Sequence, residues 1–347
     1  MKLSTYANPL ALLLLASTQQ VAGWGQLGHR TVALLAERFL LPETKEFTKH
    51  ILYGESLANA AVWPDYFAHK PEGRYSKGWH YIDAKDDPPT ECGVEFERDC
   101  KEEEGCVVAA IVNMTEQLTP PNVPNPPDRS LVLPIRFLLH FIGDIHQPLH
   151  TENIDRGGNS IPVTYHGKRF NLHSFWDSVI AEHHIGGRSF QDAVGWANSL
   201  YNMISVPTGK FAAIETQTKW KGNCFNDDGL FPDAKKARDC AMEWANDANT
   251  FVCSQVFAAY PNPRDIKGEE LGGKYYENAT MVVEELIARA GWRLGVYLNM
   301  VVTGTTGIGK IEKNAPVELP ELSLWEKVKE KVVENVSFIP GWAVVAL

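Results

Sequence analysis

The chain has little positive charge for its length. Its 347 residues include 33 lysines and arginines against 43 aspartates and glutamates, which gives a formal net charge of −10. A protein that neutralises many phosphates of duplex nucleic acid needs a long basic surface. The charge balance therefore argues against a duplex-binding protein of that kind.

Cysteine is also sparse, with six residues in the whole chain. None of the six lies in the histidine and aspartate clusters described below, so a purely structural zinc site, which is commonly built from cysteine, is disfavoured there. An even number of cysteines permits disulfides in an oxidising compartment. Six cysteines allow fifteen pairings, and the sequence pattern does not choose among them.

The apolar segment at the N-terminus is too short and wrongly flanked to span a membrane. Lys2 gives it a basic start, residues 9–16 are apolar, and residues 21–23 are small and suited to cleavage. This pattern predicts a signal peptide at residues 1–23 and a secreted protein without a membrane span. Cleavage after Gly23 would leave Trp24 with a free α-amine, and an amine and a carbonyl on one residue can chelate a metal. The alternative for Trp24 is a frayed terminus with an ordinary surface tryptophan.

Helical periodicity dominates the rest of the chain, with no competing set of strands, and predicts an all-α fold. It recurs around residues 29–40, 106–118, 131–147, 233–260 and 276–302. One small β-hairpin is expected within residues 161–170, turning at His166-Gly167. The proline-rich stretch 119–128 is expected to be irregular. We expect a single large helical domain over residues 24–302.

Residues 303–347 are expected to form a linker and tail of unknown role. Residues 303–307 resemble a flexible linker, and residues 322–336 fit a charged amphipathic helix. The end, residues 338–347, is apolar but short. A removed lipid-anchor signal, packing against the core and proteolytic processing all stay open for this segment.

The most informative cluster lies in an apolar stretch that contains His140, Asp144 and His150. On a helix, His140 and Asp144 are four residues apart, so both side chains leave the same face and can share one ion. Pro148 cannot continue that helix, and the chain must turn before His150. His150 can then approach a neighbouring ion. The alternative for His140 and Asp144 is a buried hydrogen-bonded pair without a metal.

Further ligand-type residues repeat this chemistry. His173 and Asp177 have the same spacing of four, while Asp65 and His80 each lie beside aromatic residues, and His29 follows Trp24 by five residues. Imidazole and carboxylate groups suit zinc. By contrast, His50, His69 and His166 are expected to be solvated or hydrogen-bonded. His146 is expected to be structural, because it is six residues from His140 and points away from it on a helix.

Together these motifs resemble the S1/P1-type zinc nucleases of fungi and plants, in order and spacing from Trp24 to about residue 300. The resemblance implies three zinc ions. The first would be held by Asp65, His80, His140 and Asp144, and the second by His150, His173 and Asp177. The third would be held by the amine and carbonyl of Trp24, by His29 and by Asp144, which would bridge it to the first.

The resemblance also implies the activity. Such an enzyme hydrolyses single-stranded DNA and RNA to 5′-phosphorylated products and removes the 3′-phosphate from nucleotides, and no stable protein partner is implied. Zinc suits this chemistry because it neutralises the phosphodiester and lowers the pKa of a bound water. Asp65 would be the catalytic residue that orients or deprotonates the attacking water. Substrate binding would rest on Tyr81, Asp83, Gly157, Gly158 and Asn159, with Tyr81 stacking on a base. For Tyr81 the alternative is a core aromatic, and for the glycine pair it is an ordinary turn.

One position departs from the family pattern. A basic residue commonly lies three positions after the aspartate that corresponds to Asp65, but here that position is Ala68. Losing such a contact to the phosphate would cost on the order of 2–4 kcal/mol of barrier. Lys70 and Arg74 lie nearby, although neither has the expected spacing.

Disulfides and glycosylation complete the expectations. The resemblance pairs Cys92 with Cys240 and Cys100 with Cys106, which leaves Cys224 and Cys253 as a third bridge. Acceptor sequons for N-glycosylation begin at Asn113, Asn278 and Asn335.

Two alternatives to the nuclease stay open at this point. A zinc-dependent phospholipase C would use a similar three-metal site but accept a lipid phosphodiester. Tyr81 and Asp83 beside the metal favour binding of a base over binding of a choline group. A secreted zinc-binding protein without catalysis is the other, and Ala68 is the feature that supports it.

Overall fold

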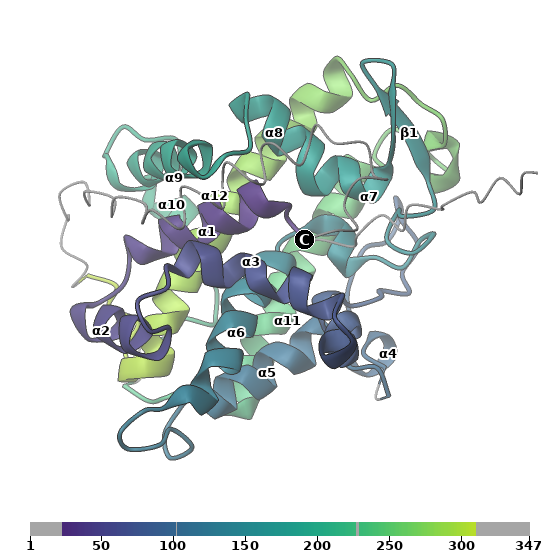
Figure 1. Ribbon diagram of the computed structural model, residues 1–347. Helices are drawn as coiled ribbons and strands as arrows, with labels where there is room; N and C mark the ends of the chain where they lie inside the picture. The colour runs from purple at the N-terminus through teal and green to yellow at the C-terminus, as the bar shows by residue number, and fades with distance from the viewer. Residues whose placement is uncertain (1–22, 102, 227–228, 310–347) are drawn as a thin grey trace, which may run out of the picture.

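The computed structural model describes residues 23–101, 103–226 and 229–309. This part of the chain is mainly helical and has one two-stranded sheet, which lies at the edge of the molecule (Figure 1), and the all-α prediction is confirmed. The longer helices, in chain order, are α1 (Gln26–Glu37), α2 (Pro42–Ile51), α3 (Leu57–Ala68), α5 (Val107–Leu118), α6 (Val132–Asp144), α9 (Phe190–Ser205), α10 (Ile214–Lys221), α11 (Ala234–Phe251) and α12 (Lys274–Thr303).

The expected helices correspond to α1, α5, α6, α11 and α12, although several boundaries shift. The region expected to be helical over 233–260 contains α11 followed by a short π-helix, η5 (Val252–Val256). Helices α2, α3, α9 and α10 have no counterpart among the sequence predictions. The stretch 119–128 is irregular, as expected.

The helices enclose one apolar core, and α1 lies across its middle (Figure 1). Helix α1 packs against α3, α9 and α12, while α5 packs against α6 and α11. Two glycines let α1 and α12 approach closely. A Cβ atom on Gly291 would lie 2.6 Å from Leu35 Cδ2, and one on Gly295 would lie 2.6 Å from the Ala36 carbonyl oxygen. The close crossing fixes where α1 places His29 against the rest of the core.

The chain turns sharply after α6, as Pro148 predicts. Helix α6 ends at Asp144, and a short 3₁₀ helix, η3 (Pro148–Thr151), begins at the proline. The backbone N–H of Gln147 donates to the Asp144 carbonyl at 2.9 Å, and that of His150 donates to the Gln147 carbonyl at 3.0 Å. The prediction that His150 leaves the phase of the α6 helix is confirmed.

The expected hairpin is present. Strand β1 (Pro162–Tyr165) pairs antiparallel with β2 (Lys168–Asn171), and His166 and Gly167 form the turn. Strand β2 leads directly into α7 (Leu172–Ser174) and the π-helix η4 (Phe175–Val179). These two short segments carry His173 and Asp177 into the core.

The disulfides correct two of the three expected pairings. Cys100 pairs with Cys106, as expected, but Cys92 pairs with Cys253 and Cys224 pairs with Cys240. The expected pairs of Cys92 with Cys240 and of Cys224 with Cys253 are wrong. Cys240 and Cys253 are thirteen positions apart on α11 and η5, which is about 20 Å at the helical rise of 1.5 Å per residue. Cys92 lies against the far end of this span, and Cys224, which follows α10, lies against the near end.

Some expectations lie outside the described residues. These are residues 1–22 of the signal peptide expected at 1–23, the sequon at Asn335, the helix at 322–336 and the apolar end at 338–347. Within the described ranges, no helix is long and apolar enough to cross a membrane.

Candidate metal centre

Eight of the predicted ligands meet in the interior, although they come from seven different segments. Asp65 lies on α3, His29 on α1, and His140 with Asp144 on α6. The 3₁₀ helix η1 (Pro71–His80) ends at His80. His150, His173 and Asp177 lie on η3, α7 and η4. The side chain of Asp65 is 16% exposed, whereas the others are 0–4% exposed, so the centre opens to solvent beside Asp65.

The tightest group consists of His80, His140 and Asp144. Asp144 Oδ2 lies 3.0 Å from His80 Nδ1 and 3.0 Å from His140 Nε2, and the two ring nitrogens are 3.0 Å apart. Two ligands that each lie 2.0–2.1 Å from a tetrahedral zinc ion are about 3.3 Å apart. Asp65 Oδ1 completes the group at 3.3 Å from His140 Nε2 and 3.7 Å from His80 Nδ1.

Asp144 links this group to His29. Its second oxygen, Oδ1, lies 3.2 Å from His29 Nε2, and the ring of His29 stacks on that of His140 with centroids 3.9 Å apart. His29, Asp65 and His140 also form a candidate group of their own. The two oxygens of Asp144 therefore face two different sets of donors, as a bridging ligand requires.

A separate group consists of His150, His173 and Asp177. Asp177 Oδ2 lies 3.3 Å from His173 Nε2, and Asp177 Oδ1 lies 3.8 Å from His150 Nε2. The two imidazoles stack with centroids 4.8 Å apart. The sequence analysis placed His140 and His150 with different ions, and the structure likewise places these two histidines in different groups.

Backbone carbonyls orient three of the imidazoles. His140 Nδ1 lies 2.7 Å from the Ala61 carbonyl oxygen, His150 Nδ1 lies 2.7 Å from that of His80, and His173 Nδ1 lies 2.6 Å from that of Gly157. A proton on Nδ1 leaves the Nε2 lone pair free for an ion, which is the usual arrangement of metal-binding histidines.

Several buried nitrogen and oxygen atoms of the predicted ligands have no hydrogen-bond partner. They are His29 Nε2, Asp65 Oδ1, Asp144 Oδ1, His150 Nε2 and His173 Nε2. Buried polar atoms are normally paired, and so many orphans aimed at common points indicate ligand positions. The residues present therefore fit metal ions, and their nitrogen and oxygen donors suit zinc.

The electrostatics of the two groups differ. Burial disfavours the charged form of Asp144, but His140 and the other nearby histidines hold the pKa of its carboxyl well below the ordinary value. In the other group, burial lowers the pKa of His173 to about 3 and raises the pKa of Asp177 well above its usual range. No protonated imidazole balances Asp177, and a bound cation would reverse its shift.

The N-terminal segment also lies at the centre. Trp24 is fully buried, which excludes the frayed terminus. A Cβ atom on Gly23 would lie 1.6 Å from Asp144 Oδ1 and 2.9 Å from His29 Nε2. The N–H of Gly25 donates to the Asp177 carbonyl at 2.8 Å and anchors this turn. The backbone around Trp24 is thus held beside the donors expected for a third ion.

The predicted base-binding residues lie on two neighbouring segments. Tyr81 and Asp83 follow directly after His80, and both are half-buried. Burial and the carboxylates of Asp83 and Glu104 raise the pKa of Tyr81, while Arg156 acts against this shift, which places the 156–159 loop close to the ring. Asp83 is paired with Lys101 at 3.2 Å, a contact absent from the sequence predictions.

The glycines of this loop have a definite backbone role. Gly157 and Gly158 have φ values of +59° and +79°. A Cβ atom on Gly157 would lie 2.6 Å from the Leu149 carbonyl oxygen, and the Gly157 carbonyl orients His173. Asn159 Nδ2 donates to the Arg156 carbonyl at 2.9 Å, which steadies the loop.

Ala68 is buried, with 4% of its surface exposed, and its short side chain brings no charge to the site. The ammonium of Lys70 lies over the ring of Tyr66, 4.4 Å from its centroid. Arg74 is exposed.

Two other buried side chains near the centre have supporting roles. His146 bonds to the Ile142 carbonyl and to Arg293 Nη1 at 3.1 Å, in line with the structural role expected for it. Gln147, which the sequence analysis missed, donates from Nε2 to Asp177 Oδ1. Its place beside Pro148 in the ligand-rich stretch is the only sequence signal for it.

Comparison with known proteins agrees with this geometry. The family model described as S1/P1 Nuclease matches residues 24–303. The chain is 40% identical over 301 residues to Nuclease S1 of Aspergillus oryzae, covering 85% of this chain and 97% of that protein. It is 35% identical over 282 residues to Nuclease P1 of Penicillium citrinum, covering 80% and 97%. It is 32% identical over 302 residues to Endonuclease 4 of Arabidopsis thaliana, covering 83% and 93%. The chain therefore belongs to the S1/P1 nuclease family and is a phosphodiesterase of that class.

Proposed function

We propose that this nuclease is a secreted, zinc-dependent endonuclease that cleaves single-stranded DNA and RNA to 5′-phosphorylated products and also acts as a 3′-nucleotidase. The observation that carries the proposal is the set of three buried histidine and aspartate groups, which meet beside the partly exposed carboxylate of Asp65. The domain responsible would be residues 24–302, with residues 303–347 as an appended tail.

Three zinc ions would be held as follows. Asp65, His80, His140 and Asp144 would hold the first. His150, His173 and Asp177 would hold the second. The third would be held by His29, by Asp144 Oδ1 and by the amine and carbonyl of Trp24, a ligand pair that exists only once the chain is cut after Gly23.

When bound, zinc ions supply charge neutralisation for the phosphodiester and acidify a coordinated water. The chain's own contribution would centre on Asp65. Its Oδ1 faces His140 Nε2 at 3.3 Å and has no hydrogen-bond partner, and its side chain borders solvent. Burial raises the pKa of Asp65, but His140 outweighs it and the net shift is downward, so the carboxylate stays ionised. The ionised carboxylate would orient the attacking water or accept its proton.

Recognition of a single strand would rest on the 81–83 and 156–159 segments. Tyr81 would stack on a base, which only unpaired nucleotides present. Asp83 and Asn159 would hydrogen-bond to the edge of that base, while Gly157 and Gly158 would let the backbone approach it. A net charge of −10 favours this local recognition over neutralisation of many phosphates.

Secretion is supported by the three disulfides and by the position of the sequons. Asn113 is exposed on α5 and Asn278 is partly exposed on α12, so both could carry glycans. Intact mass and N-terminal sequencing of the secreted protein would identify the cleavage site and the glycans.

The test of function is hydrolysis of single-stranded DNA by the secreted protein before chelation, after chelation and after zinc is restored. We expect zinc-dependent release of products with 5′-phosphate ends. Asp65→Asn should abolish turnover, while Asp239→Asn, which makes the same charge change at an exposed residue of α11, should not. Turnover of a lipid phosphodiester alone, or none despite bound zinc, would refute the proposal.

A further inference from the structure

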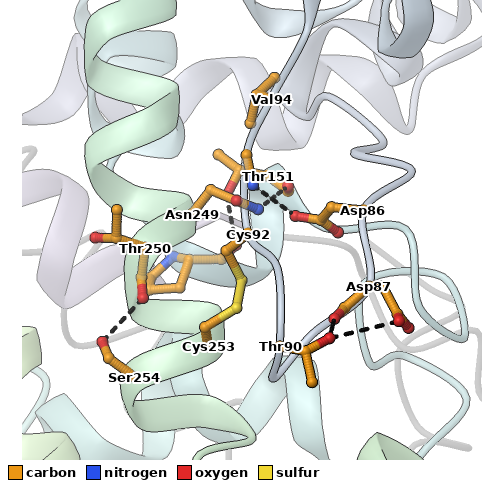
Figure 2. The surroundings of a disulfide bond; sticks show 12 residues. Asp86, Asp87, Thr90, Cys92, Val94, Thr151, Asn249, Thr250, Cys253 and Ser254 are labelled. Carbon is orange, nitrogen blue, oxygen red and sulfur yellow. Dashed lines mark hydrogen bonds between the residues drawn. A yellow bond between two sulfur atoms is a disulfide. The ribbon is translucent and has the colours of Figure 1, made fainter.

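Two acidic side chains, Asp86 and Glu152, meet outside the histidine clusters. Asp86 lies in the surroundings of the Cys92–Cys253 disulfide (Figure 2). Asp86 lies in the loop that follows the 81–83 segment, and Glu152 follows η3. The Asp86 carboxyl contacts both the Glu152 carboxyl and the side-chain amide of Asn249 on α11.

Each carboxyl accepts a backbone N–H with one oxygen, and its other oxygen faces the neighbouring side chains. Asp86 Oδ2 accepts the Gly93 N–H at 2.9 Å, and Glu152 Oε1 accepts the Ile154 N–H at 2.7 Å. Asp86 Oδ1, Glu152 Oε2 and Asn249 Oδ1 are all buried and have no hydrogen-bond partner. Glu152 is 2% exposed and Asn249 is fully buried, so bulk water does not satisfy these atoms.

The pair has no direct basic partner among the described residues. In the described residues, neither carboxyl forms an ion pair with a lysine or arginine within 4.0 Å. Arg98 interacts electrostatically with Asp86 at longer range, but its guanidinium binds Asp99 at 2.7 Å. Two adjacent carboxylates in a buried site repel each other and lose hydration, and a cation between them removes both costs.

The surroundings hold these groups in place. The disulfide ties Cys92 to η5, and Asn246 on α11 pairs with both backbone groups of Val94, at 2.9 and 3.2 Å. Asn249 Nδ2 donates to the Thr151 carbonyl at 2.9 Å (Figure 2), which fixes the amide beside the Asp86 carboxyl. The orphan oxygens are thus on rigid supports, which lowers the entropy cost of binding an ion.

We propose that Asp86, Glu152 and Asn249 form a binding site for a hard divalent cation of the Ca²⁺ type. The side chains offer only oxygen atoms, which suit Ca²⁺ and not the nitrogen-rich chemistry preferred by zinc. Ca²⁺ tolerates irregular geometry, whereas Mg²⁺ demands a near-ideal octahedron. The ion would join the loop after Asp83 to the segment after His150, so its effect would be on stability and not on the chemical step.

The test titrates CaCl₂ into the zinc-loaded, full-length secreted protein by calorimetry, with zinc content measured before and after. We expect one Ca²⁺ per chain beyond the zinc, and a rise of about 2–4 °C in the unfolding midpoint once Ca²⁺ exceeds its Kd several-fold. Asp86→Asn and Glu152→Gln should each abolish both effects. Asp87→Asn, which removes the same charge from the exposed neighbour, should leave them unchanged.

Three outcomes would overturn the proposal. One is the absence of binding heat up to about 10 mM Ca²⁺, above the weakest range of extracellular calcium modules. Another is binding that persists at full strength in both variants, because the ion then lies elsewhere. The third is an unfolding midpoint in Glu152→Gln that is higher than that of the wild type and does not change with Ca²⁺. The two carboxyls of the wild type would then share a proton and not an ion. Because zinc content is measured in both variants, an effect of Asp86→Asn that comes from loss of zinc is distinguished from loss of the Ca²⁺ site by its absence in Glu152→Gln.

Discussion

Gln147 orients two ligands of one metal group, and replacing it with leucine should weaken that group alone. The side chain is fully buried. Its Nε2 donates to Asp177 Oδ1, and its Oε1 accepts the Leu149 N–H at 2.5 Å, which fixes the start of η3 and thereby His150. Gln147→Leu keeps the approximate volume and removes both bonds.

The magnitude follows from the role of such supporting contacts. Losing an orienting partner of a metal ligand typically costs 10- to 100-fold in metal affinity or activity, which is about 1.4–2.8 kcal/mol. Within the described chain, the side chain of Gln147 makes no hydrogen bond to the ligands of the other two groups, and its backbone bond to the Asp144 carbonyl is kept in the variant. We therefore expect one zinc equivalent to be released at a free-zinc concentration about 10 to 100 times higher than in the wild type.

The assay is zinc content at equilibrium with graded chelator, combined with kcat on single-stranded DNA. Gln117→Leu is the matched control, because Gln117 is exposed on α5 and its side chain bonds to Asn113, far from the metal ligands in sequence. The control should match the wild type in both measurements. Release of all the zinc in a single weakened step, or an unchanged titration, would refute the assignment of Gln147 to the His150, His173 and Asp177 group.

Three further changes test other parts of the site and fold. Gly157→Ala should lower the unfolding midpoint and weaken zinc binding about 10- to 100-fold, because the φ of +59° at Gly157 and its carbonyl bond to His173 are both disturbed. The control is Gly167→Ala, at φ +72° with open space around it, which should lower stability alone. Equal zinc loss in both variants would contradict the argument. Ala68→Lys should raise kcat by up to about a hundredfold if the phosphate lacks a cation at this position; an unchanged kcat with full zinc content would show that another group already supplies the charge. Cys224→Ser opens a disulfide of sequence separation 16 and should cost about 3 kcal/mol of unfolding free energy; a denaturant titration with an unchanged midpoint would contradict that value.

Local spacing was sufficient for the parts of the site that lie on one element. His140 and Asp144 share a face because α6 is a regular helix, and Pro148 ends that phase for the reason that proline always does. The same holds for the hairpin turn at His166 and Gly167. These features depend on interactions between near neighbours in sequence, which the residue types specify directly.

The supporting contacts could not be read in the same way. The carbonyls of Ala61 and Gly157 that orient His140 and His173 belong to residues with no distinctive side chain. Gln147 is one amide among many until the structure shows Asp177 beside it.

The disulfides show the same limit most clearly. The cysteine count predicted their presence, and the short separation of Cys100 and Cys106 agrees with the pairing found. For the other four cysteines, the choice of partner depends on which end of the α11–η5 span each loop reaches, and that is decided by tertiary packing.

The sequence by itself determined the helical class, the ligand types and the local pairs, because helix periodicity and side-chain chemistry act over a few residues. Only the tertiary structure decided how Asp144 faces two groups at once, where Gln147 acts, and how Asp86 and Glu152 come to share a buried site. Those arrangements join segments far apart in the chain, and they depend on packing such as the close crossing of α1 and α12 at Gly291 and Gly295. Packing of that kind is a collective property of the core, and no single motif in the sequence encodes it.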